Sequence, residues 1–97
     1  MLNTGMILDG FVSPEQMRKE RLKSQELKAS QWWKQQIGPG LCFHCHQKFS
    51  KNELTMEHLI PISRGGKSNK KNVVPSCRAC NTTKGHKLAV EISFEQL

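Results

Sequence analysis

Two Cys-x-x-Cys pairs, Cys42/Cys45 and Cys77/Cys80, restrict the fold of this chain more than any other feature. A chain of 97 residues makes one domain at most, and domains this small often need a metal or a covalent crosslink to stay folded. Its first residues lack the pattern of a signal peptide, so we expect a reducing cytoplasm, where paired cysteines bind metal rather than form disulfides. Two such pairs can complete one tetrahedral zinc site.

Other interpretations of these cysteines explain the spacing less well. Four reduced core cysteines would not need two pairs with knuckle spacing. Cys42, Cys45 and His58 also match part of a two-cysteine, two-histidine finger, but no second histidine follows His58 at the required distance. His44 and His46 flank Cys45 and could compete for the metal, although surface positions are the simpler interpretation for both.

The charge of the chain indicates a polyanionic partner. It has 15 Lys+Arg against 8 Asp+Glu, a formal net charge of +7. All of this excess lies in the half that carries the cysteines, where nine basic and two acidic residues fall between positions 42 and 87. No apolar run is long enough to span a membrane, so nucleic acid is the expected partner and a membrane is not.

The N-terminal part predicts one long helix. Residues 1–12 form a short mixed segment that we expect to be loosely ordered, unless its apolar part, residues 6–12, docks as an edge strand. A helix is predicted for 13–37, because Ser13 can cap it, Pro14 suits its first position, and glycines and a proline at 38–40 end it. We expect at least one of its two adjacent tryptophans to pack the helix onto the cysteine knuckle.

The remaining segments predict two short strands and a helix. Residues 53–60 alternate in polarity, which is typical of a strand that has His58 on its aliphatic side and Glu57 on the other. A second short strand begins at position 73 and is expected to end at Pro75. The second cysteine pair then leads into a helix over 78–89.

An ordered set of residues between the cysteine pairs resembles the HNH nuclease family. The residues that carry the resemblance are Glu57 and His58, Pro61, the Gly65-Gly66 turn, Asn72, and Cys77-x-x-Cys80-Asn81 followed by Lys84. Family members more often have aspartate in the position of Glu57, and Asn81 replaces the last histidine of the family name. The resemblance implies an α+β fold, a small ββα-metal (His-Me finger) domain over 41–97 that a four-cysteine zinc site holds together, preceded by the N-terminal helix.

The site residues follow partly from chemistry and partly from the resemblance. His58 can take a proton near neutral pH, so we assign it as the general base. The resemblance implies that Glu57 and Asn81 share a catalytic Mg²⁺ or Mn²⁺, for which their oxygen ligands are suited, and that Asn72 braces the loop near His58. Because Glu57 lies on the opposite face of an ideal strand, we expect a kink before Pro61 to turn it inward.

The expected activity is metal-dependent hydrolysis of DNA. One such site cuts one strand, so we expect nicking of double-stranded DNA, and double-strand cleavage would need a dimer or two sequential nicks. The resemblance implies products with 5′-phosphate and 3′-hydroxyl ends. We expect a cytoplasmic protein of bacterial or phage origin that is a monomer or weak dimer. Sequence preference should be weak unless a protein partner supplies it. The residues expected to contact DNA are Arg64, Lys67, Lys70, Lys71, Arg78 and Lys84.

Two alternatives to an ordinary HNH nuclease remain open. One is a non-catalytic zinc-ribbon module that binds nucleic acid, which explains the cysteines and the charge but not the residues at positions 57, 58 and 81. The other is an HNH fold in which the longer side chain of Glu57 weakens metal binding. Activity with Mn²⁺ but not Mg²⁺, which demands stricter geometry, is the expected sign of that case.

Overall fold

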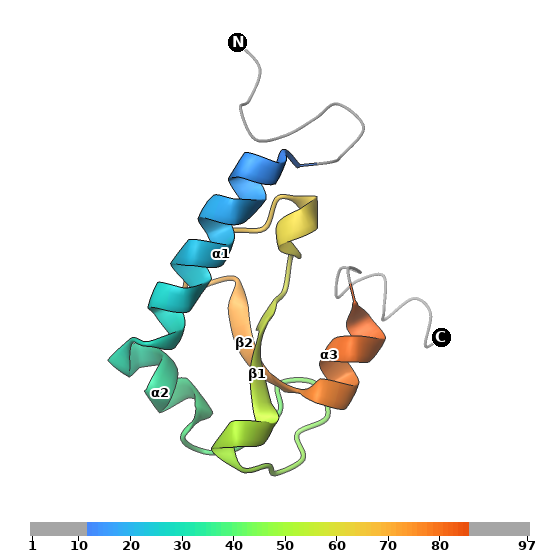
Figure 1. Ribbon diagram of the computed structural model, residues 1–97. Helices are drawn as coiled ribbons and strands as arrows, with labels where there is room; N and C mark the ends of the chain where they lie inside the picture. The colour runs from blue at the N-terminus through green and yellow to red at the C-terminus, as the bar shows by residue number, and fades with distance from the viewer. Residues whose placement is uncertain (1–11, 86–97) are drawn as a thin grey trace.

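The computed structural model describes residues 12–85 (Figure 1). The elements in chain order are α1 (Pro14–Lys28), α2 (Gln31–Ile37), the short 3₁₀ helix η1 (Lys51–Glu53), β1 (Leu54–His58), a second 3₁₀ helix η2 (Ile62–Arg64), β2 (Val73–Cys77) and α3 (Arg78–Lys84). Most of the N-terminal segment expected over 1–12, and the helical residues expected beyond position 85, lie outside this range.

The N-terminal region forms two helices, which corrects the prediction of one. Helix α1 starts as expected, with the Ser13 side chain accepting a hydrogen bond from the Gln16 amide. The helix is interrupted at Ser30, which has an extended backbone and caps the start of α2. Its hydroxyl accepts a hydrogen bond from the Trp33 amide and donates one to the Leu27 carbonyl. Serine is a strong helix cap, so a residue that looked like a helix interior position starts α2.

The two strands form an antiparallel pair whose register places Leu54 opposite Cys77 and His58 opposite Val73. Contrary to expectation, β2 continues through Pro75 to Cys77. A proline is tolerated on the open edge of a sheet because it has no N–H to leave unpaired. Its carbonyl is used on that edge, where it accepts a hydrogen bond of 2.8 Å from the amide of Phe43 in the first cysteine turn.

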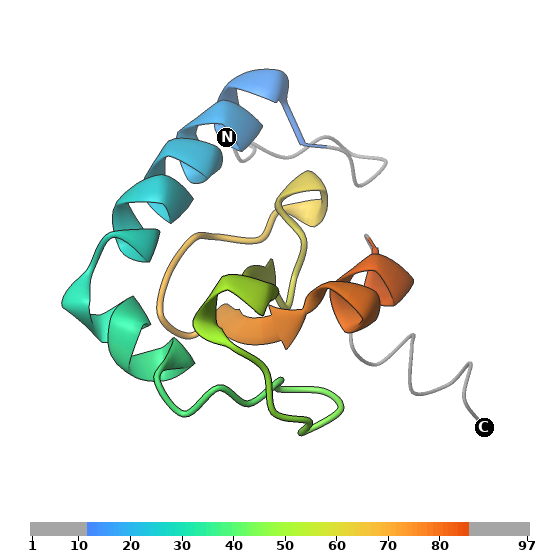
Figure 2. The ribbon, with the colours of Figure 1, turned by 60° about the horizontal axis from the view of Figure 1, so that its bottom comes forward.

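The sheet lies between two groups of helices (Figures 1 and 2): α1 and α2 curve around one side, and α3 lies on the other. On the α2 side, Trp33 packs with Met56 and Val73, so the tryptophan contacts the sheet rather than the knuckle. The second apolar cluster contains Cys42, Leu54 and Cys77 beside the knuckle, and the partly buried Ile37 packs against both clusters.

The order of elements β1–β2–α3 and the clustered cysteines confirm the expected small α+β fold with a ββα core. The N-terminal helices are additional to this core. Within 12–85, no helix combines the length and the apolar character needed to cross a membrane.

Candidate active site

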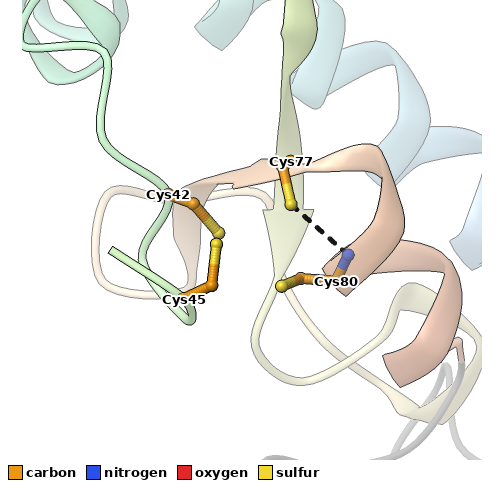
Figure 3. Close-up of side chains that lie close together, drawn as sticks. All are labelled: Cys42, Cys45, Cys77 and Cys80. Atoms are coloured by element: carbon orange, nitrogen blue, oxygen red, sulfur yellow. Dashed lines mark hydrogen bonds between the residues drawn. The ribbon is translucent and has the colours of Figure 1, made fainter. Parts of the chain in front are cut away.

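The four cysteine sulfurs converge on one point (Figure 3). Cys42 and Cys45 come from the turn after α2, Cys77 ends β2, and Cys80 lies in the first turn of α3. Their Sγ atoms all lie within 4.8 Å of one another. Sulfurs around a tetrahedral zinc at 2.3 Å lie about 3.8 Å apart, so a small contraction would suit the ion. The thiols therefore form a candidate metal site of the kind that holds structural zinc.

The acidities of these thiols also favour a bound cation. Burial raises the pKa of Cys42, but backbone amides that point at its sulfur outweigh this effect and lower the pKa to about 6. Burial and the neighbouring sulfurs raise the pKa of Cys80 to about 12. The first thiolate therefore forms easily and the last does not, because negative charges accumulate in one place. A metal ion would relieve that repulsion.

His58 ends β1, and its ring faces the N-terminal helix. Its Nε2 atom lies 2.9 Å from Oγ of Ser68. The Ser68 hydroxyl donates to the backbone carbonyl of Glu20 on α1, at 2.6 Å. Burial is the main cause that lowers the pKa of His58 below its usual value, and the positive charges of Lys28 and Lys84 lower it further, against the opposing effect of the nearby carboxylates. The ring is therefore neutral, and able to accept a proton, at pH 7.

Glu57 points to the opposite side of β1 from His58. Its carboxylate is only 2% exposed, and Nε2 of His44 lies 2.8 Å from Oε1 and 2.7 Å from Oε2. Lys84 of α3 is equally buried; its ammonium group lies 3.8 Å from Oε2 of Glu57 and donates to the carbonyl of His58 at 3.0 Å. A buried carboxylate thus has an imidazole on one side and a cation on the other.

Asn81 lies on the Glu57 side of the strand. Its side chain contacts Thr55, two residues before Glu57 and on the same face of β1, with Nδ2 3.0 Å from Oγ1 of Thr55. Because the Thr55 hydroxyl donates its one proton to the Ser76 carbonyl, it can only accept from Asn81. The amide nitrogen of Asn81 therefore faces Thr55 and its oxygen faces away. No kink is needed to bring Glu57 to this side, because α3 packs against it, and that prediction was wrong.

Asn72 ties together the loop of residues 59–72 that joins the strands. Its Oδ1 accepts from the Ile60 amide at 2.8 Å, and its Nδ2 donates to the carbonyls of Ile60 and Lys67 at 3.0 and 2.8 Å. The loop also brings Gly66 against the same backbone: a Cβ at Gly66 would lie 1.7 Å from the Ile60 carbonyl oxygen. The chain that follows His58 is thus held by backbone contacts that only these residue types allow.

A family model described as HNH endonuclease matches residues 42–97. The match covers more than half of the 97 residues. The chain belongs to the HNH endonuclease family. No curated protein matches it. The family implies a nuclease with a nucleic-acid substrate, and the matched HNH domain contains every cysteine of the candidate metal site together with Glu57, His58, Asn72 and Asn81.

The six basic residues expected to contact DNA fall into two groups. Arg64, Lys67, Lys70, Lys71 and Arg78 are exposed, and the first four lie in the 59–72 loop. Lys70 also lies 5.7 Å from the centre of the Trp32 ring. Lys84 differs from them because it is buried between β1 and α3. Its expected contact with a DNA phosphate does not fit this position, and its contacts assign it to the support of the strand end.

Sequence analysis missed three residues that contact this site. His44 was interpreted as a surface residue, yet it contacts Glu57. Glu20 and Ser68 had no motif at all, because they are 48 positions apart and meet only when α1 packs on the loop. Glu20 is almost completely buried, and buried carboxylates need partners, but this burial is visible only in the folded structure.

Proposed function

We propose that this HNH domain hydrolyses phosphodiester bonds of double-stranded DNA in a reaction that depends on a divalent metal. The observation that supports the proposal is the Thr55–Asn81 hydrogen bond, because it holds the Asn81 side chain against the face of β1 that also carries the buried Glu57 carboxylate. A carboxylate and an amide oxygen are ligands of the kind that Mg²⁺ and Mn²⁺ take. The general base, His58, is the next residue after Glu57.

Three side chains would hold the catalytic metal: Glu57, Asn81 and His44. His44 is included because its Nε2 atom approaches both oxygens of Glu57, and a nitrogen and a carboxylate that share a proton can instead share a metal ion. When bound, the metal supplies positive charge that stabilises the negative charge developing on the phosphate and the leaving oxygen. Lys84 would hold the Glu57 carboxylate in place through its contacts with β1.

His58 would take the proton from the attacking water molecule. Its lowered pKa keeps the ring neutral at pH 7, so the base is ready before the substrate arrives. Because His58 and Glu57 point to opposite sides of β1, the scissile phosphate must lie across the end of that strand to meet both. Asn72 would keep this end in shape, since it bonds to the backbone only two residues beyond His58.

DNA would lie along the exposed basic residues of the 59–72 loop. Such contacts to phosphates give affinity without sequence preference, so we propose nicking with low sequence specificity, by a monomer or weak dimer, unless a protein partner directs it. Zinc is the ion that we propose for the four cysteines, as a structural rather than a catalytic metal.

One observation favours a second candidate, a zinc-ribbon module that binds nucleic acid without cutting it. His44 and Lys84 already surround the Glu57 carboxylate, so this carboxylate is satisfied without a metal. In that case the zinc-loaded protein would bind DNA and never cleave it.

Nicking of a plasmid separates the two candidates, and resealing of the nicks tests the chemistry of the product ends. We would treat a supercoiled plasmid with the zinc-loaded protein and Mn²⁺ or Mg²⁺, isolate open circles, and incubate them with DNA ligase. The nuclease described here leaves 5′-phosphate and 3′-hydroxyl ends, so ligase should close the circles. Binding of the plasmid without nicking supports the ribbon module, and nicks that ligase cannot close contradict the proposed chemistry.

A further inference from the structure

Helix α1 lies outside the residues that the HNH family model matches, yet it reaches the catalytic histidine through one serine. Ser68 of the 59–72 loop contacts Glu20 of α1 twice. Its hydroxyl donates to the Glu20 backbone carbonyl at 2.6 Å, and its amide donates to Oε1 of the Glu20 side chain at 2.7 Å. The same hydroxyl oxygen lies 2.9 Å from Nε2 of His58. A continuous set of hydrogen bonds thus joins α1 to His58.

These contacts decide which nitrogen of His58 carries the proton. A serine hydroxyl has one proton to donate, and Ser68 donates it to the Glu20 carbonyl. Toward His58 the Ser68 oxygen can therefore only accept, so Nε2 of His58 must be the donor. A neutral imidazole with its proton on Nε2 has its free electron pair on Nδ1. The atom left to accept a proton from water is therefore Nδ1.

Glu20 is held firmly enough to serve as an anchor. Its side chain is 1% exposed and accepts a hydrogen bond from Nε2 of Gln16 at 3.1 Å. Lys23 and Lys67 lie 3.5 and 3.9 Å from its Oε2 atom. Although burial raises the pKa of Glu20, the Ser68 amide and the two lysines together lower it below its usual value. The carboxylate therefore stays ionised, and an ionised acceptor strengthens its bond to the Ser68 amide.

We propose that Ser68 and Glu20 are positioning residues that hold His58 with its proton on Nε2 and leave Nδ1 as the base, which makes α1 a part of the active site. The inference rests on the proposed role of His58 as base for its effect on cleavage, but the position of the proton on the ring does not depend on that role. The competing explanation is that these bonds only attach α1 to the loop. In that case the His58 ring would not depend on the Ser68 hydroxyl.

The first test is nuclear magnetic resonance of the wild-type, zinc-loaded protein without DNA, at a pH where His58 is neutral. Correlation of the ring nitrogens with the ring carbon protons identifies the protonated nitrogen of His58. We expect a single form with the proton on Nε2 and a ring N–H signal that the Ser68 bond protects from exchange with water. A neutral ring with its proton on Nδ1 would overturn the proposal without any variant.

The second test compares Ser68→Ala with Ser68→Thr. Alanine removes the acceptor, so the Nε2 proton should exchange at least about tenfold faster and kcat should fall about ten- to 100-fold, with KM for DNA unchanged. Threonine keeps a hydroxyl, so Ser68→Thr should show wild-type exchange of the Nε2 proton and wild-type kcat. The matched control is Ser24→Ala, which removes the hydroxyl of a buried serine within α1; among residues 12–85, this hydroxyl donates to the Arg21 carbonyl and does not contact His58.

The outcomes separate this inference from the nuclease proposal. In one outcome the Nε2 proton of His58 is protected from exchange in the wild type and unprotected in Ser68→Ala, but the wild type never cleaves DNA. This outcome supports the positioning role of Ser68 and contradicts the proposed nuclease function. In another outcome the wild type cleaves DNA, and Ser68→Ala has the same exchange rate and the same kcat as the wild type. This outcome contradicts the positioning role of Ser68 and leaves the nuclease proposal standing. Zinc content and thermal unfolding of each variant establish that the fold is retained.

Discussion

His44 Nε2 lies 2.7 and 2.8 Å from the two carboxylate oxygens of Glu57, and so joins the first cysteine turn to β1 near the end of that strand. This contact connects the candidate metal site of the four cysteines with the candidate catalytic site. It also changes the ligands available to a catalytic metal, because imidazole nitrogen suits transition metals better than it suits Mg²⁺.

Replacing His44 by Ala should therefore weaken the binding of Mn²⁺ about tenfold or more, since even outer contacts of metal ligands contribute that much. Binding is measured by titration of the zinc-loaded protein, followed by the electron paramagnetic resonance signal of free Mn²⁺. His46→Asn is the control: His46 is exposed, has a φ of 60°, and asparagine tolerates that backbone. Equal Mn²⁺ affinity in His44→Ala and wild type would exclude His44 as a ligand.

Replacing Cys77 by Ser should cause loss of zinc and of the folded HNH domain. Zinc bound by such sites contributes about 10–16 kcal/mol to folding, which is as large as the whole free energy of unfolding of a domain of this size, about 5–15 kcal/mol. Circular dichroism and metal analysis of the purified variant test this. A zinc-free Cys77→Ser protein with wild-type secondary structure and a cooperative thermal transition would show that the cysteines do not form a structural site.

Replacing Gly66 by Ala should destabilise the 59–72 loop strongly. The added Cβ would lie 1.7 Å from the carbonyl oxygen of Ile60, which forces the backbone apart and disturbs the bonds of Asn72 to the same residue. We expect a loss of about 3 kcal/mol or more in the free energy of unfolding, measured with denaturant. Gly38→Ala is the matched control, because its nearest atoms lie at 3.4 Å. Similar stability losses in both variants would contradict the close approach at Gly66.

The pH dependence of kcat should reflect the lowered pKa of His58. Burial, followed by the charges of Lys28 and Lys84, favours the neutral ring, and the neutral form is the one that acts as base. Cleavage should therefore be constant near pH 7 and decline only below pH 6.5, the usual value for histidine. A profile that already declines as pH falls from 8 to 7 would contradict this assignment.

The same shift affects stability. Because the folded pKa of His58 lies below the unfolded value, the unfolded chain binds more protons between the two values. The contribution of His58 is thus present above pH 6.5 and is lost as pH falls toward its folded pKa. Denaturant titrations of the wild type and His58→Gln at several pH values measure this. Equal pH dependence in the two proteins would contradict it.

Replacing Lys70 and Lys71 together by Ala should weaken DNA binding and reduce its salt dependence. Each phosphate contact that is lost reduces the slope of log affinity against log salt by about 1, so the double variant should lose about 2. Binding to a labelled duplex is measured at several salt concentrations. Lys51→Ala, which changes an exposed lysine of η1, is the control. If the slope of log affinity against log salt is unchanged in the double variant, Lys70 and Lys71 do not contact the DNA phosphates.

Local patterns in the sequence predicted the parts of this structure that depend on short-range chemistry. The cysteine spacing predicted the sulfur cluster, and the alternation around Met56 predicted β1 with His58 on its aliphatic side. Ser30 was missed because the same serine is compatible with a helix interior and with a cap, and only the packing of Trp33 on the sheet decides between them.

Contacts between distant segments could not be predicted in this way. The kink expected before Pro61 was inferred from a strand considered alone, whereas the packing of α3 brings Asn81 to the face that Glu57 already occupies. The Glu20–Ser68 hydrogen bonds depend on how α1 packs against the 59–72 loop. The pattern of polar and apolar residues along the sequence does not indicate this packing. The residues that sequence analysis missed are thus those whose partners lie in another element.

The most direct test of the central claim is relaxation of a supercoiled plasmid by the zinc-loaded wild type and His58→Ala, with Mn²⁺, with Mg²⁺, and with no added metal. We expect open circles only from the wild type and only with added metal, while His58→Ala retains zinc, folding and plasmid binding. Equal nicking by both proteins would contradict the role of His58. Plasmid binding without nicking by the wild type in either metal would contradict the nuclease itself.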